Sequence, residues 1–163
     1  WVVWAWLVQI GQDRAGFYSY ERLERLFGAD IHNASALNPA WQHRAPGDRI
    51  PATQEGYAGG VFGARPGWTV SEVVPCRALV LDMWGSFVVL PNGPDRSRLL
   101  VRSRMGGPDA PAVGAAVSFL AFEMPHFIME REMLRGIKAR AESPRGQLGA
   151  SPCGERAARS SPC

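Results

Sequence analysis

Short runs of β-favouring residues, separated by turn residues, dominate the middle of the chain. Valine, leucine and aromatic residues fill four such runs, which are 68–74, 78–83, 86–90 and 97–105. The spacers between them are short and rich in Pro and Gly, as at 91–94. Parallel neighbours would need crossovers of about a dozen residues or more, so these runs predict an antiparallel sheet. A further short strand is predicted at 48–53.

The start of the chain has the spacing of helices. Residues 1–10 combine Trp, Leu and Ile with few helix breakers and end at Gly11, which is typical of the last turns of a helix with a glycine stop. A second helix is predicted over 20–27, where apolar residues recur at helical spacing, with Ser19 as its cap and Gly28 as its end.

The longest helical pattern covers 119–141. Proline fits the first turn of a helix and breaks the interior, so the helix proper is predicted to begin near Pro125. Residues 143–163 are mostly Ser, Pro, Gly, Ala and Arg, which is typical of a disordered tail. One ordered domain is therefore expected over 1–142.

The order of elements is helix, helix, grouped strands and one long C-terminal helix. Helices segregated from an antiparallel sheet define the α+β class. The chain has 163 residues, 46% hydrophobic and 20% charged, which suits one domain with one core. Six Trp and seven Phe residues favour large apolar contacts or a cavity.

The charge pattern and the first residues exclude several classes of partner. The net charge of +3 is scattered and forms no basic stripe, so nucleic acid binding is not expected. The apolar run 1–8 is far shorter than the roughly 20 residues that cross a bilayer, and it lacks the features of a signal peptide. We expect a cytoplasmic protein without integral membrane association, monomeric or weakly dimeric. Because the chain begins with Trp1, we also expect that an upstream segment is lost.

Several segments resemble a bacterial branch of the SRPBCC (START/Bet v 1-like) superfamily, described as polyketide cyclase/dehydrase-like or uncharacterised. They are 3–11, 14–20, 30–32, 47–51, 125–131 and 136–138 (VWAWLVQIG, RAGFYSY, DIH, GDRIP, PHFIMER and GIK). The resemblance implies a helix-grip fold, in which two short N-terminal helices accompany a curved antiparallel sheet wrapped around a long C-terminal helix. It also implies a cavity for a lipid, polyketide or aromatic metabolite. Relatives begin with a strand that this chain lacks, so an N-terminally truncated domain is expected.

The C-terminal helix carries the sharpest candidate site. On a helical wheel, Phe127, Leu134, Ile137 and Ala141 form one stripe with Glu130 in its middle, and His126 lies four residues before Glu130. A carboxylate on a face that looks into a cavity is costly unless it is paired or acts on a ligand. Glu130 and His126 are therefore candidate acid/base or ligand-orienting residues. The alternative is an ion pair of Glu130 with Arg102 or Arg104 that docks the helix.

Further candidates line the expected cavity. Arg102 and Arg104 share one strand face, which is either solvent-exposed or able to bind a carboxylate of the ligand. Core packing is the alternative role of the other lining candidates, which are Trp6, Tyr18, Tyr20, Trp68, Trp84, Phe87, Phe127 and Leu134.

Asp30-Ile31-His32 forms a second polar cluster, either functional or a brace for its loop. No nucleotide motif, serine-nucleophile setting or metal-ligand spacing is present, so no cofactor and no metal are expected.

Three hypotheses follow for the function. The first is a binding module for a hydrophobic small molecule. The second is a cyclase- or dehydratase-like enzyme in which Glu130 or His126 moves a proton. The third is a truncated, partly folded product without activity.

Overall fold

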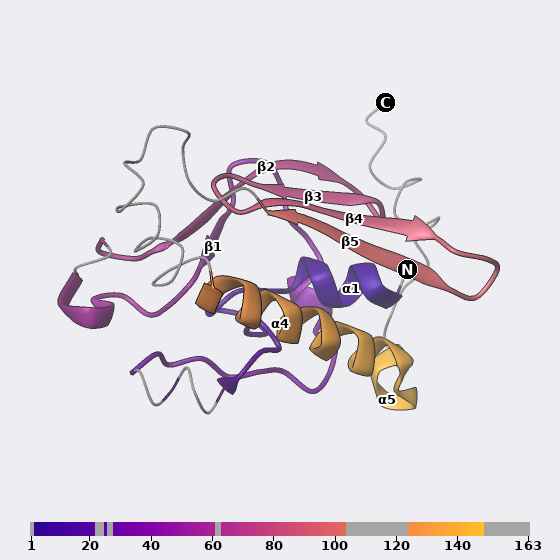
Figure 1. The fold of residues 1–163 in the computed structure, drawn as a ribbon, viewed down its shortest axis with the longest axis horizontal. Helices are drawn as coiled ribbons and strands as arrows, with labels where there is room; N and C mark the ends of the chain where they lie inside the picture. The colour runs from indigo at the N-terminus through magenta and orange to yellow at the C-terminus, as the bar shows by residue number, and fades with distance from the viewer. Residues whose placement is uncertain (1, 22–24, 26–27, 61–62, 104–123, 149–163) are drawn as a thin grey trace.

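The computed structural model describes residues 2–21, 25, 28–60, 63–103 and 124–148, and these form an α+β fold. Among them, one sheet contains β1 (Arg49–Pro51), β2 (Gly67–Val74), β3 (Ala78–Leu81), β4 (Gly85–Pro91) and β5 (Ser97–Ser103). Helices α1 (Val2–Val8) and α4 (Met124–Glu142) lie on the same side of the sheet, and α5 (Pro144–Gln147) follows α4 (Figure 1). Two short 3-10 helices, η1 (Pro39–Trp41) and η2 (Tyr57–Gly60), lie in the connections.

The sheet is a meander in which each strand pairs antiparallel with the next. The predicted strands are confirmed with small shifts at their ends, and β1 is shorter than predicted. Residues 104 and 105 of the last predicted strand lie outside the described residues. Alternate side chains such as Leu79, Phe87 and Val89 are buried, and the sheet curls over the helices (Figure 1). The hydrophobic core therefore lies between the sheet and the helices.

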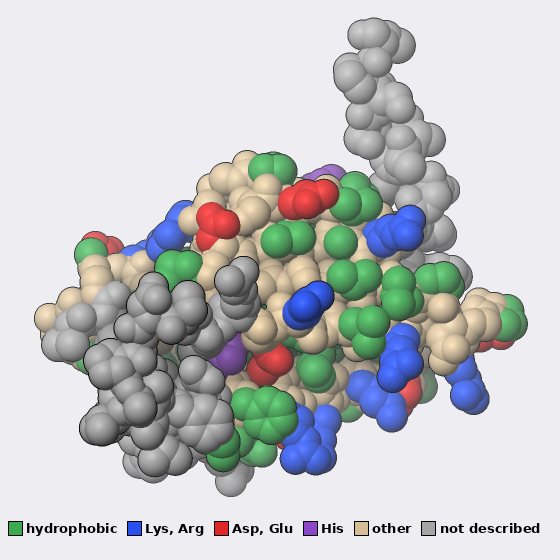
Figure 2. Space-filling view, turned by 45° about the horizontal axis from the view of Figure 1, so that its top comes forward, with side chains coloured by type: hydrophobic (Ala, Val, Ile, Leu, Met, Phe, Trp, Pro, Cys, Tyr) green, Lys and Arg blue, Asp and Glu red, His purple; other side chains and the backbone are tan. Residues whose placement is uncertain are grey.

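The opposite face of the sheet meets solvent. Val74, Ala78, Val88 and Leu100 are consecutive cross-strand partners and form an apolar row over four strands. Val74 and Leu100 are exposed. Figure 2 shows hydrophobic side chains gathered on this face with charged side chains among them.

The N-terminal helix is confirmed as α1, and Arg44 satisfies its C-terminal end. Arg44 donates from Nε to the Val8 carbonyl at 3.2 Å and from Nη2 to the Ile10 carbonyl at 2.5 Å. A cation at this end of a helix is also favoured by the helix dipole. Of the second predicted helix, Glu21 and Arg25 are helical, whereas 22–24 and 26–27 lie outside the described residues. Within the described ranges, no helix combines the length and apolar composition that crossing a bilayer requires.

The C-terminal helix begins at Met124, which confirms the predicted start near Pro125, and 119–123 lie outside the described residues. Its buried stripe differs from the predicted one. Met133 and Ile137 are each 1% exposed, whereas Phe127 is 59% exposed. At about 100° per residue, Glu130 lies with the two buried residues and Phe127 about a quarter-turn away. The observed buried stripe is therefore rotated about the helix axis relative to the predicted one. Contacts of α4 with other elements determine this rotation, and they cannot be read from helical spacing alone.

The ordered chain continues beyond the predicted domain end at residue 142. Ser143 caps α5 by accepting the Gly146 N–H at 2.9 Å, and the Trp6 indole N–H donates to the Gly146 carbonyl at 3.0 Å. The predicted disordered tail is therefore wrong for 143–148, because a helix cap and a long-range hydrogen bond order a segment with few apolar residues. Residues 149–163 lie outside the described part of the chain.

Candidate functional site

A carboxylate, Glu130, lies on the face of α4 that meets the sheet, and its side chain is 13% exposed. Trp84 donates its indole N–H to Glu130 Oε2 at 2.9 Å, and the Ser103 hydroxyl donates to the same oxygen. His126 Nε2 lies 3.5 Å from Oε2, which is an ion-pair distance rather than a hydrogen bond. We call Glu130, His126, Trp84 and Ser103 the carboxylate site.

Helix and strand periodicity position three members of the carboxylate site. His126 and Glu130 are four residues apart, so they lie side by side on α4. Ser103 is the last residue of β5. Strand alternation places it on the same face as Val101, which packs against the core. The hydroxyl of Ser103 therefore faces α4.

The tight connection between β3 and β4 positions Trp84. Met83 before it has a φ of 64°, and Gly85 after it has a φ of 136°. A Cβ at residue 85 would lie 2.0 Å from the Arg102 carbonyl oxygen. Glycine is therefore required where β4 begins beside β5, because any side chain would push the strands apart. This close approach holds Trp84 next to the end of β5, where Ser103 lies.

Several effects act on the charge of Glu130. Burial favours the neutral acid and raises the pKa of the carboxyl group. The neighbouring His126 and the hydrogen bonds from Ser103 and Trp84 act in the opposite direction. Together they outweigh burial and hold the pKa of Glu130 below its ordinary value. Glu130 is therefore an ionised hydrogen-bond acceptor at neutral pH.

An aromatic cluster borders the carboxylate site. The Trp84 ring centroid lies 4.2 Å from that of Trp68, 5.1 Å from that of Phe87 and 5.5 Å from that of His126. Phe17 lies 5.8 Å from Trp68 and 5.9 Å from Trp84. Trp84 and Phe87 are buried, whereas Trp68 is partly exposed. The predicted lining residues Trp68, Trp84 and Phe87 are thus brought together with Glu130 and His126.

The structure does not pair Glu130 with an arginine among the described residues. Arg102 is exposed, and strand alternation places it on the face opposite Ser103. This outcome agrees with the predicted solvent-exposed face. It corrects the suggested ion pair of Glu130 with Arg102, because the two side chains lie on opposite sides of β5. Arg104 lies outside the described residues.

Trp6 and Tyr18, which were predicted to line the site, contact the other half of α4. Their ring centroids are 5.6 Å apart, and the Arg140 guanidinium lies 4.6 Å from the Tyr18 ring centroid. The Tyr18 hydroxyl donates to the Trp6 carbonyl and accepts from Gln9 Nε2, each at 3.0 Å. Burial raises the pKa of the Tyr18 phenol. These two residues therefore connect α1 and α4 as part of the core.

Three more predicted lining residues are not among the described contacts of Glu130. Tyr20 is 40% exposed, and Phe127 is 59% exposed because α4 is rotated relative to the prediction. Leu134 is half-buried on α4. The predicted ligand-binding set therefore divides, and only its members near Trp84 lie at the carboxylate site.

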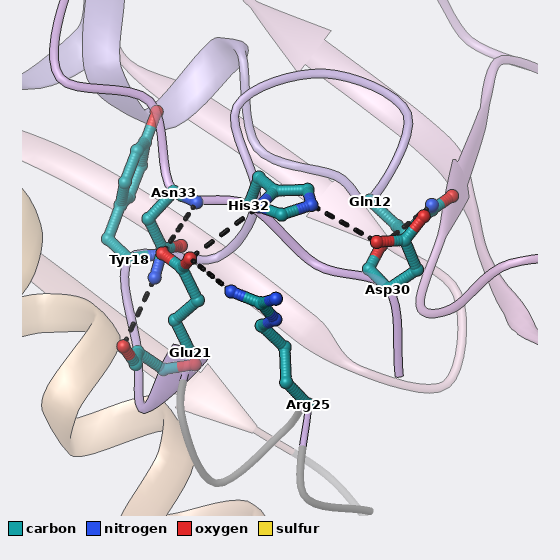
Figure 3. Close-up of polar contacts among 8 residues, drawn as sticks. Gln12, Tyr18, Glu21, Arg25, Asp30, His32 and Asn33 are labelled. Atoms are coloured by element: carbon teal, nitrogen blue, oxygen red, sulfur yellow. Dashed lines mark hydrogen bonds and ion pairs between the residues drawn. The ribbon is translucent and has the colours of Figure 1, made fainter. Parts of the chain in front are cut away.

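The Asp30-Ile31-His32 segment belongs to an exposed polar cluster (Figure 3). His32 Nε2 lies 3.1 Å from Asp30 Oδ1, and its Nδ1 lies 3.6 Å from Glu21 Oε1. Glu21 also accepts the Asn33 N–H at 3.2 Å. These contacts brace the loop, as one of the two predictions for this cluster proposed. Among the described residues, no three potential metal ligands come together.

Ser103 is the member of the carboxylate site that the sequence did not single out. Its signal was a hydroxyl on the strand face that otherwise carries Leu99 and Val101. A polar residue in an inward series requires a hydrogen-bond partner. Sequence alone does not indicate that the partner is Glu130.

Comparison with known proteins does not identify a family for this chain. No family model, no curated protein and no solved structure matches the chain. The function therefore has to be inferred from the residues of the chain itself.

Proposed function

We propose that this chain is a helix-grip domain that binds an apolar small molecule between its sheet and α4. The observation that carries the proposal is the ionised Glu130 carboxylate beside an aromatic cluster. A carboxylate in apolar surroundings is costly unless hydrogen bonds or a ligand compensate it. The SRPBCC resemblance, the curled sheet and the long C-terminal helix support the same function.

The second oxygen of Glu130 indicates which group the ligand carries. The hydrogen bonds from Trp84 and Ser103 and the ion-pair contact of His126 all involve Oε2. No described residue donates to Oε1. An ionised carboxylate only accepts hydrogen bonds. The proposed ligand therefore presents a donor, such as a hydroxyl or phenol group, and not a carboxylate of its own.

The aromatic cluster suits the apolar part of such a ligand. Trp68 and Trp84 lie with their ring centroids 4.2 Å apart, and Trp68 is partly exposed. Aromatic faces pack well against flat rings. We therefore favour a hydroxylated aromatic or polyketide-like molecule as the ligand class.

The electrostatics of Glu130 favour binding over catalysis. An efficient general base at neutral pH has a pKa near 7, which enzymes usually reach by raising the pKa of a carboxyl group. The contacts of Glu130 lower its pKa instead. The carboxylate is a stable acceptor and a weak base, so a cyclase or dehydratase that relies on it is the less favoured function.

Native mass spectrometry of the purified chain, followed by extraction, tests the proposal first. A retained hydrophobic molecule with a hydroxyl group is the expected result. Titration calorimetry with naphthol, naphthalene and naphthoate then tests the chemistry of the site. We expect naphthol to bind most tightly and naphthoate most weakly, because the carboxylate repels an anion.

Glu130→Gln and a matched control sharpen this test. Loss of the charge is expected to weaken naphthol binding about tenfold, since a hydrogen bond to a charged group is worth roughly 1.5–3 kcal/mol. Naphthalene binding is expected to stay unchanged. Glu142→Gln, at the exposed end of the same helix, is the control. Equal effects of the two variants, or no preference for naphthol, would contradict the proposal.

A further inference from the structure

We infer that the outer face of α4 binds the surface of an anionic lipid bilayer. Seven exposed residues at helical spacing lie on this face, and they are Met124, Phe127, Ile128, Arg131, Arg135, Lys138 and Glu142. The first three are apolar and lie in the first turns of the helix. The next three are cationic and follow along the same side, and Glu142 is the last residue of the helix. The inference does not depend on the proposed ligand.

The apolar end of this face contains three adjacent side chains that are exposed to solvent. Met124, Phe127 and Ile128 are 39%, 59% and 45% exposed. An isolated exposed apolar side chain is ordinary, but several adjacent ones indicate an interaction surface. The three lie within two turns of each other at the end of α4, so they can enter an interface together.

The cations that follow are available for anionic groups. Arg131 forms no ion pair with a described residue. Arg135 lies 3.6 Å from Glu132, and Lys138 lies 4.0 Å from Glu142. The Arg135 and Lys138 side chains are 58% and 72% exposed. Exposed ion pairs of this kind contribute little, so a lipid phosphate can replace the carboxylate partner.

A bilayer surface fits this arrangement better than an acidic protein. Helices that lie in a membrane interface carry apolar residues that reach the acyl boundary and basic residues at the level of the head groups. Each Lys or Arg near an anionic leaflet adds attraction that falls off within about a Debye length. On α4 the apolar and basic residues occupy successive turns of one side, which lets both contact the same flat surface.

Vesicle co-sedimentation of the full chain tests the inference. The chain is expected to bind phosphatidylcholine vesicles that contain phosphatidylserine, and much less to vesicles of phosphatidylcholine alone. Added salt is expected to release it. Phe127→Ser and Arg131→Glu are each expected to lower binding about tenfold, from lost apolar insertion and from charge reversal.

Matched controls separate this face from the rest of the surface. Leu100→Ser removes an apolar side chain that is 41% exposed on the outer face of the sheet, and Arg98→Glu reverses a charge on β5. Both are expected to bind as the parent chain does, and circular dichroism checks that all four variants stay folded. Equal losses in controls and test variants would overturn the inference. Absence of binding to either vesicle would also overturn it and would favour an acidic protein as partner.

Discussion

The two halves of α4 contact the rest of the chain in different chemical ways. In the C-terminal half, Gly136 lies so close to Tyr18 that a Cβ would be 2.2 Å from the Tyr18 carbonyl oxygen. Arg140 donates to the Ala34 carbonyl at 2.9 Å and covers the Tyr18 ring. In the N-terminal half, Glu130 meets the sheet through side-chain hydrogen bonds.

This difference separates contacts that specify the fold from contacts that are available for function. The C-terminal half packs against Tyr18, whose backbone N–H and side-chain hydroxyl are both hydrogen-bonded. The N-terminal half presents one carboxylate oxygen without a described donor and several exposed apolar side chains. We therefore expect substitutions in the C-terminal half to reduce stability, and those in the N-terminal half to change binding.

Gly136→Ala is expected to have the largest effect on stability. The new methyl group would also lie 2.7 Å from Tyr18 Cβ, so α4 has to move away. Overpacking of this kind typically costs 1–3 kcal/mol, and the better helix propensity of Ala offsets part of it. We expect a loss of about 2 kcal/mol, which corresponds to a decrease in Tm of about 4–8 °C in a domain of this size.

Thermal melts followed by circular dichroism measure this effect. Ala139→Leu, which adds bulk at an exposed position on the same helix, is expected to change Tm little. A cooperative transition of the parent chain would count against a truncated, partly folded product. If Gly136→Ala has the same Tm as the parent chain, the inference that Gly136 packs closely against Tyr18 is wrong.

Arg140→Met is expected to have the next largest effect. Methionine keeps the apolar stem but removes the hydrogen bond to Ala34 and the cation over the Tyr18 ring. The combined loss is about 1–2 kcal/mol. Urea unfolding measures it, with an unchanged slope showing that the unfolded state is the same. Arg135→Met, on the exposed side of α4, is the control and is expected to lose at most about 0.5 kcal/mol.

The strands and helices could be predicted because their signals are local. Period-two runs and short turn segments located β2 to β5, and Pro125 located the start of α4. The segment 143–148 was not predicted, because the indole of Trp6 that hydrogen-bonds to Gly146 is distant in the sequence. The rotation of α4 about its axis was not predicted either, because it depends on contacts with residues that are distant in the sequence. Gly136 reads as an ordinary helix residue until Tyr18 is known to lie against it.

Only the part of the candidate site that lies within one helix could be predicted from the sequence. Helical spacing placed Glu130 on the buried side of α4 with His126 beside it. The partners from the sheet depend on how β5 and the β3–β4 turn approach the helix, and one sequence does not contain that information. An ion pair with an arginine was one of the two predictions for Glu130, whereas the structure supplies Ser103 and Trp84 as its hydrogen-bond donors.

Glu130→Gln is expected to have the smallest effect on stability, and its pH dependence is the sharpest test of the comparison. The glutamine oxygen still accepts from Trp84 and Ser103, so only the charge is lost. We expect a decrease of about 1 kcal/mol at pH 7, the difference between a charged and a neutral hydrogen bond. Tm measurements of both chains between about pH 7 and pH 3 follow it, with Glu142→Gln as the exposed control.

The sign of the pH dependence decides between binding and catalysis. A carboxyl group whose pKa is lower in the folded state stabilises the fold above its unfolded pKa of about 4.3. That contribution is lost as the pH falls through the lower folded value, so the Tm difference between the parent chain and Glu130→Gln is expected to shrink as the pH falls below about 4.3. A raised pKa would have the opposite sign. The parent chain would then gain stability relative to Glu130→Gln as the pH falls, because protonation would relieve a buried charge. Such a carboxyl group would be suited to proton transfer, and the enzyme hypothesis would replace the binding function proposed for this half of α4.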